Sequence, residues 1–136
     1  MARLVPKIYP NDVDENNPIG LSFPLTVGTQ EQNYYTSKQV HDNLRNLILT
    51  MKGERPMNPN FGCDIYYLLF EQLYEDEMQL AAKEAITEAV NSWMPAVNIR
   101  DVQVDSQPDR NLVLVKVFYS VNGWSADNVL NLEVKV

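Results

Sequence analysis

The sequence predicts an α+β fold: an N-terminal arm, three helices, then a three-stranded, mainly antiparallel sheet. Apolar residues recur at helical spacing between positions 36 and 93, whereas apolar and polar residues alternate after Pro95. Helices and strands are thus segregated along the chain, as is typical of α+β domains. The 136 residues match the size of one ordinary domain. We expect residues 1–33 to form an extended arm and residues 34–136 a single domain.

Residues 1–33 carry few signals for regular structure. Four prolines interrupt any helix in this segment, and a polar run of turn-forming residues lies between them. Apolar side chains return at positions 19–25, where we expect Leu21, Phe23 and Leu25 to anchor the arm on a surface. Either this domain or a neighbouring subunit would offer that surface.

Three helices are predicted after the arm. The first begins at Thr36, which forms a capping box with Gln39. The second is predicted over residues 64–73 with Asp64 as its N-cap, and the third over roughly 75–93. The predicted inward faces comprise Val40, Leu44, Leu47, Ile48 and Met51, then Ile65, Leu68, Leu69 and Leu73 with Phe70 beside them, and finally Met78, Ala82, Ala85, Ile86, Ala89 and Trp93.

Three strands are predicted after the helices. Residues 97–104 carry two alternating pairs that are out of phase, which predicts a bulge near Arg100. Residues 111–121 are apolar on both faces, so this strand is expected to be central. A hairpin loop is expected at 105–110, and residues 129–136 alternate as a last strand.

The charge balance is acidic, with 11 Lys and Arg against 18 Asp and Glu, for a net charge of −7. Basic clusters that would bind phosphate groups are absent, so nucleic acid is not an expected partner. No apolar run approaches the ~20 residues of a membrane span, so no membrane partner is expected. Residues 57–92 hold Lys83 against seven acidic residues. A solvated helical face explains this block, and a docking surface for a basic partner is the alternative.

Metal, cofactor and catalytic chemistry find little support in the sequence. His41 and Cys63 are single residues without a ligand partner, and no glycine-rich phosphate loop occurs, so we expect no metal and no cofactor. Glu54, Asp64 and Glu71 are candidate carboxylates for glycoside hydrolysis. Asp64 and Glu71 share a helix face but lie about 10 Å apart along it. Each carboxylate also has a structural explanation, so we expect no catalytic residue.

The most specific pattern lies between positions 47 and 71. It reads Leu47-Ile48-Leu49-Thr50, then Lys52-Gly53-Glu54-Arg55-Pro56, Pro59, Phe61-Gly62 and Leu68-Leu69-Phe70-Glu71. This pattern resembles the sheath-initiator family of the baseplate wedge in contractile-tailed phages, which has counterparts in type VI secretion. The segment 19–25 is also similar to family members that have an N-terminal arm. The resemblance covers roughly residues 17–136.

The resemblance implies a non-enzymatic structural subunit at the base of the sheath in the tail baseplate of the virion, assembled in the host cytoplasm. Its implied partners are other baseplate wedge proteins, the first ring of tail sheath subunits and the tail tube, with about six copies around the tail. The residues expected to bind wedge partners are Gly53, Glu54, Arg55, Pro56, Phe61, Gly62, Trp93, Met94 and Pro95. The strand expected to bind the sheath by strand exchange presents Leu130, Leu132, Val134 and Val136.

One departure from the family pattern changes the expected wedge contact. Where the family usually carries Glu-Pro-Arg, this chain has Met94-Pro95-Ala96. We therefore expect an apolar contact through Trp93 or Met94 in place of an ion pair.

Two alternatives remain open at this stage. Members of the family are often labelled lysozyme-like, and a peptidoglycan-cleaving glycosidase would clear a cell-wall suspension, an activity that Glu54→Gln or Glu71→Gln would abolish. The equivalent subunit of a bacterial contractile injection system would have the same sequence features, and genome neighbours would separate it from a phage protein.

Overall fold

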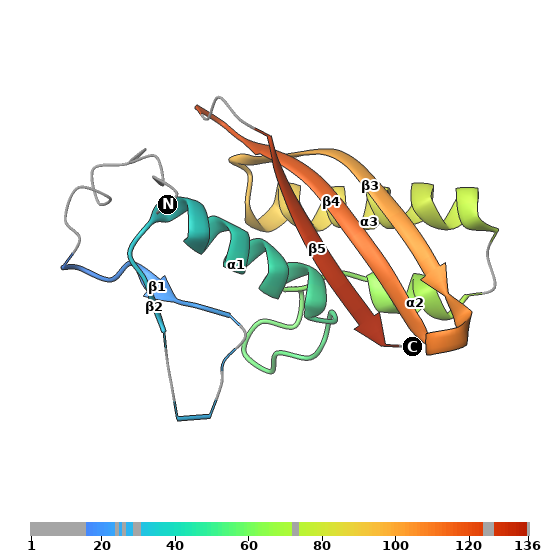
Figure 1. Ribbon diagram of the computed structural model, residues 1–136, viewed down its shortest axis with the longest axis horizontal. Coiled ribbons are helices and arrows are strands. Elements are labelled where there is room, and N and C mark those ends of the chain that lie inside the picture. The colour runs from blue at the N-terminus through green and yellow to red at the C-terminus, as the bar shows by residue number, and fades with distance from the viewer. Residues whose placement is uncertain are drawn as a thin grey trace. The chain divides into compact units, whose positions relative to one another are not determined.

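The computed structural model describes residues 16–23, 25, 27–28, 31–71, 74–123 and 127–135, without the side chains of residues 75 and 108. The chain forms two compact units, Met1–Asn46 and Leu47–Val136, and helix α1 (Thr36–Leu49) crosses the boundary between them (Figure 1). Three helices and a three-stranded antiparallel sheet confirm the predicted α+β class. Within the described ranges, no helix combines the length and apolarity that crossing a membrane requires.

The first unit contains a small hairpin that the sequence analysis did not anticipate. Strand β1 (Gly20–Leu21) pairs antiparallel with strand β2 (Gln32–Asn33). The expectation of an irregular arm is therefore wrong for these residues. Two-residue strands carry no readable alternation, which is why the pattern hid them. The division of the chain into an arm and a domain at residue 33 stays a prediction.

A buried polar cluster ties this hairpin to α1. The Asn33 side chain is almost fully buried, and its Nδ2 donates to the Leu21 carbonyl at 3.2 Å, to Gln39 Oε1 at 3.0 Å and to Asp42 Oδ2 at 2.8 Å. Asp42, also buried, accepts a further bond from the Phe23 main-chain N–H at 3.4 Å. Inside the first unit, the arm is thus held by hydrogen bonds to helix side chains.

The predicted apolar anchors contribute less to this attachment than expected. Leu21 and Leu25 are 41% and 55% exposed, and Phe23 is half-buried. Their apolar surface is therefore left largely open in the described chain. Their role as anchors on a partner stays a prediction.

In the second unit, α3 (Glu75–Trp93) matches its predicted range, whereas α2 (Ile65–Phe70) is shorter than the predicted 64–73. Helix α2 stops because Glu71 has extended backbone angles, φ −75° and ψ 138°. Residues 72–73 lie outside the described chain. Phe70 is 65% exposed, so its predicted inward position is wrong.

The sheet has the order β3-β4-β5, with strands β3 (Val97–Gln107), β4 (Leu112–Val121) and β5 (Asn128–Lys135). The central place of β4 and the bulge near Arg100 are confirmed, since the β3–β4 register shifts between Ile99 and Asp101. The hairpin loop predicted at 105–110 is wrong in extent. Strand β3 continues to Gln107, and a single 3-10 turn followed by a left-handed Asn111 (φ 48°) closes the hairpin.

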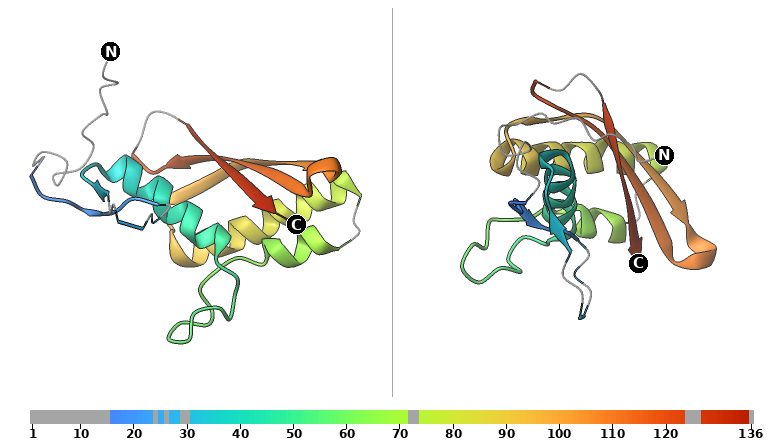
Figure 2. Two further views of the ribbon diagram at one scale, coloured as in Figure 1. Left: turned by 60° about the horizontal axis from the view of Figure 1, so that its bottom comes forward. Right: turned by 60° about the vertical axis from the view of Figure 1, so that its left-hand side comes forward.

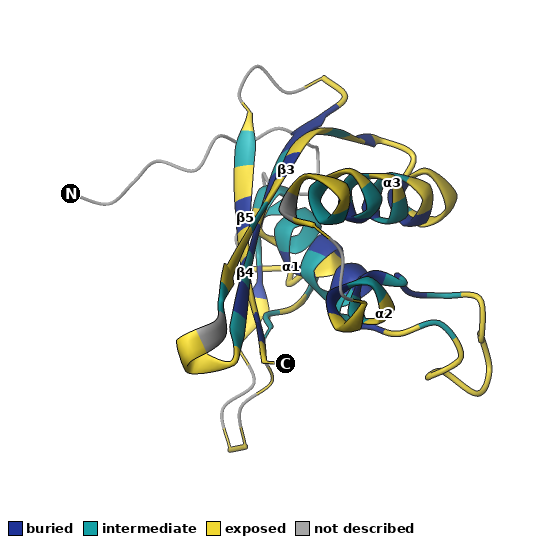
Figure 3. Cartoon of the chain, turned by 90° about the vertical axis from the view of Figure 1, so that its right-hand side faces the viewer, coloured by how far each residue is buried: buried dark blue, intermediate teal, exposed yellow. Residues whose placement is uncertain are grey.

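The core of the second unit lies between the sheet and its helices. Figure 3 shows α2 and α3 on one side of the sheet, where α3 packs against β3. Each fully buried aliphatic or aromatic side chain contributes about 1.5–3 kcal/mol of hydrophobic free energy. Fully or nearly fully buried residues of this unit include Ile65, Ala82, Ile86, Val90, Val102, Val115, Val117, Tyr119, Leu130, Leu132 and Val134.

We predict that Asp42→Ala loosens the arm. The variant removes the acceptor of the Phe23 N–H and one of the three acceptors of Asn33 Nδ2, and a buried donor that loses its partner costs roughly 1–3 kcal/mol. Limited proteolysis of the purified protein should show faster cleavage between residues 19 and 33. The control is Lys38→Ala, an exposed residue of α1 outside the cluster, which should leave the cleavage rate unchanged. Equal cleavage rates in the two variants would show that the cluster does not hold the arm.

Candidate functional site

The segment with the family-like pattern forms a closed loop between α1 and α2. At its base, the Cys63 N–H donates to the Thr50 carbonyl at 2.8 Å. Further out, the Gly53 N–H donates to the Pro59 carbonyl at 2.7 Å. These two bonds bring distant parts of the segment together. In Figure 2 the loop, drawn in green, projects away from α2 and α3.

Two glycines of the loop have positive φ, and one of them also has no space for a side chain. A Cβ on Gly62 (φ +132°) would lie 2.5 Å from the Thr50 carbonyl oxygen and 2.9 Å from the Met51 carbonyl carbon. A Cβ on Gly53 (φ +89°) would meet nothing within 4 Å. Gly62 is therefore required by close backbone approach, and Gly53 by backbone conformation alone.

Charged side chains hold the base of the loop. Lys52 Nζ bonds Asp64 Oδ2 at 2.8 Å and lies 3.9 Å from Glu88 Oε1. The hydrogen bond to Asp64 raises the pKa of the Lys52 ammonium above its usual value. Glu54 Oε2 accepts a bond from the Met51 N–H at 3.1 Å.

Asp64 is the N-cap residue of α2, as predicted. Its side chain makes no capping bond, however, because its carboxylate bonds Lys52. A charge-assisted bond to an ammonium is stronger than one to a neutral N–H, which explains the choice of partner.

An aromatic stack connects the loop to the end of α3. The Arg55 guanidinium lies over the Phe61 ring, 4.0 Å from its centroid. Phe61 meets Trp93 edge to face, with centroids 5.1 Å apart and an angle of 67° between the rings. The structure thus brings Trp93 to two other predicted partner-binding residues, Arg55 and Phe61, that are far from it in sequence.

The remaining predicted residues of this site lie around the stack. Gly53, Glu54 and Pro56 are exposed in the outer part of the loop, and Gly62 is buried at its base. Met94 is half-buried and Pro95 exposed, directly after α3. Sequence reasoning missed Met57, which is 97% exposed beside Pro56.

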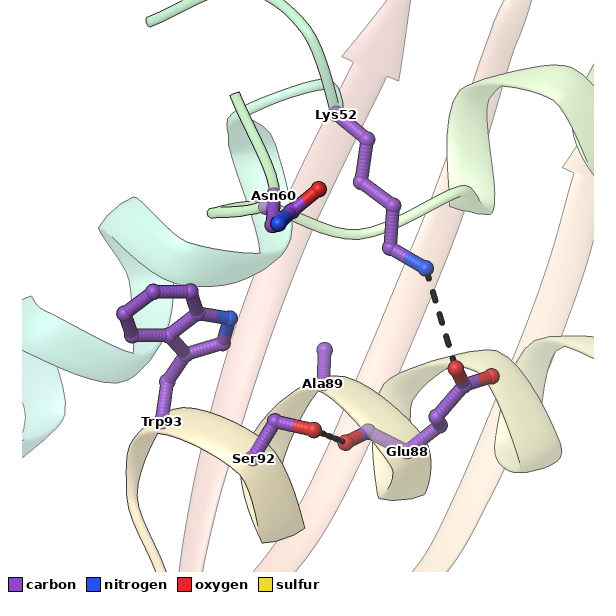
Figure 4. A pocket seen from close by; sticks show the side chains of 7 residues that line it. Lys52, Asn60, Glu88, Ala89, Ser92 and Trp93 are labelled. Carbon is purple, nitrogen blue, oxygen red and sulfur yellow. Dashed lines mark hydrogen bonds and ion pairs between the residues drawn. The ribbon is translucent and has the colours of Figure 1, made fainter. Parts of the chain in front are cut away.

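A pocket of about 290 Å³ lies between the base of the loop and the last turns of α3 (Figure 4). Its walls combine Lys52, Asn60 and Gly62 of the loop with Glu88, Ala89, Ser92 and Trp93 of α3. The sequence analysis did not single out Asn60 or Ser92, and it noted Glu88 only as part of the acidic block. The repeat of Glu88 and Ser92 at i, i+4 was the available signal.

The isolated histidine and cysteine show no sign of chemistry. Cys63 is fully buried, and burial raises the pKa of its thiol to about 11, so a reactive thiolate is disfavoured near neutral pH. His41 is half-buried, and burial lowers the pKa of its imidazole. Among the residues that the structure describes, no group of three His, Cys, Asp or Glu side chains is placed to hold a metal ion.

Strand β5 forms an edge of the three-stranded sheet, paired with β4. Leu130, Leu132 and Val134 are buried, whereas the alternating residues between them are exposed. Val136, the last residue predicted for this strand, lies outside the described chain. The described part of β5 thus has one apolar face on the core and one polar face.

The family model described as baseplate wedge protein gp25 matches residues 36–124, and the chain therefore belongs to this family. This confirms the resemblance predicted from the loop. The baseplate wedge protein gp25 of Enterobacteria phage T4 is 32% identical over 87 residues, which cover 62% of this chain and 63% of that protein. The match thus spans less than two thirds of the T4 protein.

Solved structures share the fold at lower sequence identity. A protein of Geobacter sulfurreducens proposed to be a tail lysozyme has a TM-score of 0.65 at 18% identity, covering 82% of this chain and 96% of that one. A chain of the type VI secretion system baseplate complex has a TM-score of 0.56 at 13% identity, covering 72% and 91%. A chain of the anti-feeding prophage baseplate has a TM-score of 0.53 at 20% identity, covering 84% and 82%.

We predict that the aromatic stack stabilises the fold of the isolated protein. Phe61→Ala should lower the free energy of unfolding by roughly 2–3 kcal/mol, because it removes both ring contacts of a half-buried side chain. Arg55→Ala should cost about 0.5–1 kcal/mol, the value of an exposed cation–π contact. Urea denaturation measures both, and Arg55→Lys should fall between wild type and Arg55→Ala. If Arg55→Ala leaves the free energy of unfolding unchanged but prevents wedge assembly, Arg55 does not stabilise the fold and instead contacts a partner.

Proposed function

We propose that the chain is a non-enzymatic structural subunit of a contractile phage tail baseplate wedge, placed at the base of the sheath. Membership of the baseplate wedge family supports the assembly, and the edge position of β5 carries the proposal about the sheath. An edge strand presents main-chain N–H and C=O groups that a strand from another chain can pair with. A sheath subunit supplies that strand.

The side chains of β5 fit this role. Leu130, Leu132 and Val134 hold the strand on its own core, so the added strand binds to a rigid template. Glu133 and Lys135 are exposed and of opposite charge. Cross-strand charge pairs contribute about 0.2–1 kcal/mol each, enough to select register, while the ladder supplies the affinity.

The loop and the end of α3 form the second contact in this proposal. The stack of Arg55, Phe61 and Trp93, together with Met94 and Pro95, binds the large wedge proteins. Trp93 is 37% exposed, which leaves apolar surface for such a contact. The exposed loop residues Gly53, Glu54, Pro56 and Met57 extend this surface.

The proposed setting is the tail baseplate of a virion assembled in the host cytoplasm. The partners are other wedge proteins, the first sheath ring and the tail tube, with about six copies around the tail. A second candidate is the equivalent subunit of a bacterial contractile injection system, favoured by the folds shared with the type VI secretion and anti-feeding prophage baseplates. The genes beside this one separate the two.

The contacts of two of the three candidate carboxylates, Glu54 and Asp64, support a role without catalysis. Glu54 accepts a main-chain bond inside the loop, and Asp64 is paired with Lys52, so both stabilise local structure. A general acid needs a carboxyl group free to reach the glycosidic oxygen. Purified protein should therefore leave a cell-wall suspension turbid, and clearing of the suspension would restore the lysozyme hypothesis.

We predict that Glu133→Pro blocks sheath assembly. Proline removes a main-chain N–H from β5 and cannot continue a paired edge. Electron microscopy of assembled particles should show baseplates that contain the variant but lack extended sheaths. Glu133→Gln keeps the N–H at the same position and should support sheaths of normal length. Normal sheaths on baseplates containing the proline variant would contradict strand addition at β5.

A further inference from the structure

The pocket beside Trp93 has a volume of about 290 Å³, which is enough to hold one long side chain. Its lining comes from the base of the loop and the end of α3, both in the unit Leu47–Val136. Both segments belong to the surface through which the chain is proposed to bind its wedge partner, so the expected occupant is a side chain of that partner.

The charges around the pocket favour a cation. Lys52 is its positive side chain, and the ammonium is already bonded to Asp64 at 2.8 Å. Glu88 lies 3.9 Å from that ammonium, beyond hydrogen-bond distance, and its side chain is 73% exposed. Lys52, Asp64 and Glu88 together carry one net negative charge. Glu88 therefore keeps carboxylate oxygens available for a second cation.

The surrounding sequence reinforces this charge preference. Lys83 is the one basic residue between positions 57 and 92. Its ammonium lies 3.6 Å from Asp101 of β3, so it is paired with the sheet. Glu88 and Asp64 attract a cation and the Lys52 ammonium repels it, so the net charge of −1 on the three groups favours a cation over an anion by a small margin.

The aromatic wall selects among cations. Figure 4 shows Trp93 on the same helix as Glu88, with Asn60 and Lys52 across the pocket. Arg55 already covers Phe61 at the far end of the aromatic stack, and Trp93 ends the stack at the pocket. Tryptophan is the strongest cation–π acceptor, and a planar guanidinium can stack on its ring.

We propose that this pocket receives an arginine side chain from a partner wedge protein. The guanidinium donates to the Glu88 carboxylate, and the rest of the side chain extends across the pocket toward Trp93, which lies at its other end. The proposal rests on the proposed function, because it names the chemistry by which the loop and the α3 end recognise their wedge partner. Glu88 belongs to the acidic block of residues 57–92, so this proposal assigns a binding role to one carboxylate of that block.

The test is a titration of the full-length protein with short peptides, followed by NMR of the Trp93 indole N–H. The chain has two tryptophans, and Trp93→Phe assigns the resonance. N-acetyl-Gly-Arg-Gly-amide should shift this resonance saturably, the lysine analogue more weakly, and the uncharged citrulline and anionic glutamate analogues not at all. Glu88→Gln should weaken binding of the arginine peptide by about tenfold or more, the loss expected for a charge-assisted hydrogen bond.

Glu84→Gln is the matched control, because it removes the same charge one helical turn earlier from an exposed position outside the pocket lining. It should bind the arginine peptide as wild type does. Equal shifts with the citrulline peptide, a shift with the glutamate peptide, an absent response, or equal affinity in Glu88→Gln would each overturn the proposal.

A baseplate assembly assay distinguishes failure of the pocket proposal from failure of the proposed function. If wild-type protein enters baseplates but the arginine peptide does not bind, the pocket proposal fails and the proposed function stands. If wild-type protein does not enter baseplates, the proposed function fails whatever the peptide does.

Discussion

The main-chain hydrogen bond from Cys63 to Thr50 closes the loop on which the candidate site depends. It forms only because Gly62 has no Cβ, since any side chain there would lie 2.5 Å from the Thr50 carbonyl oxygen. The bond joins the residue that follows α1 to the chain just before α2. The loop closed in this way carries Lys52, Arg55 and Phe61, which make the charged and aromatic contacts of the site.

The contacts within the site form a connected set. Closure places Lys52 beside Asp64, and their bond occupies the carboxylate that would otherwise cap α2. It also directs Phe61 at Trp93, so that a loop residue shapes the end of α3. The pocket lies between these two contacts, with Lys52 on one wall and Trp93 on the other (Figure 4). The loop is thus at once part of the fold and the framework of a binding surface.

Strong periodicity made much of the second unit predictable. Helix α3 repeats apolar residues over five turns, and β4 is apolar on both faces over ten residues, so both elements could be placed. The break in the alternation of β3 predicted the bulge near Arg100. Helix α2 was predicted too long because Leu73 continues the apolar helical spacing past Glu71, where the extended backbone ends the helix. The exposed Phe70 shows in addition that the apolarity of one residue does not reveal which way its side chain faces.

Contacts between polar residues far apart in sequence were beyond prediction. The Asn33–Asp42 bond that ties the arm to α1 joins two unremarkable polar residues across nine positions, with no periodic signature. The walls of the pocket likewise come from two segments of the chain. Asn60 could be identified as a wall residue only once the structure showed α3 on the other side of the pocket. The family pattern pointed to the loop, but the stack through Arg55, Phe61 and Trp93 required coordinates.

The most direct measurement of the central claim compares Gly62→Ala with Gly53→Ala in urea denaturation. Both variants place alanine at positive φ, which costs about 1–2 kcal/mol. Gly62→Ala also forces its Cβ against the backbone of Thr50 and Met51, adding roughly 1–3 kcal/mol of overpacking. Gly62→Ala should therefore be clearly the less stable variant and should lose the ring-current shifts between Phe61 and Trp93. Equal stability in the two variants, with the ring-current shifts intact, would contradict loop closure as the constraint that forms the site.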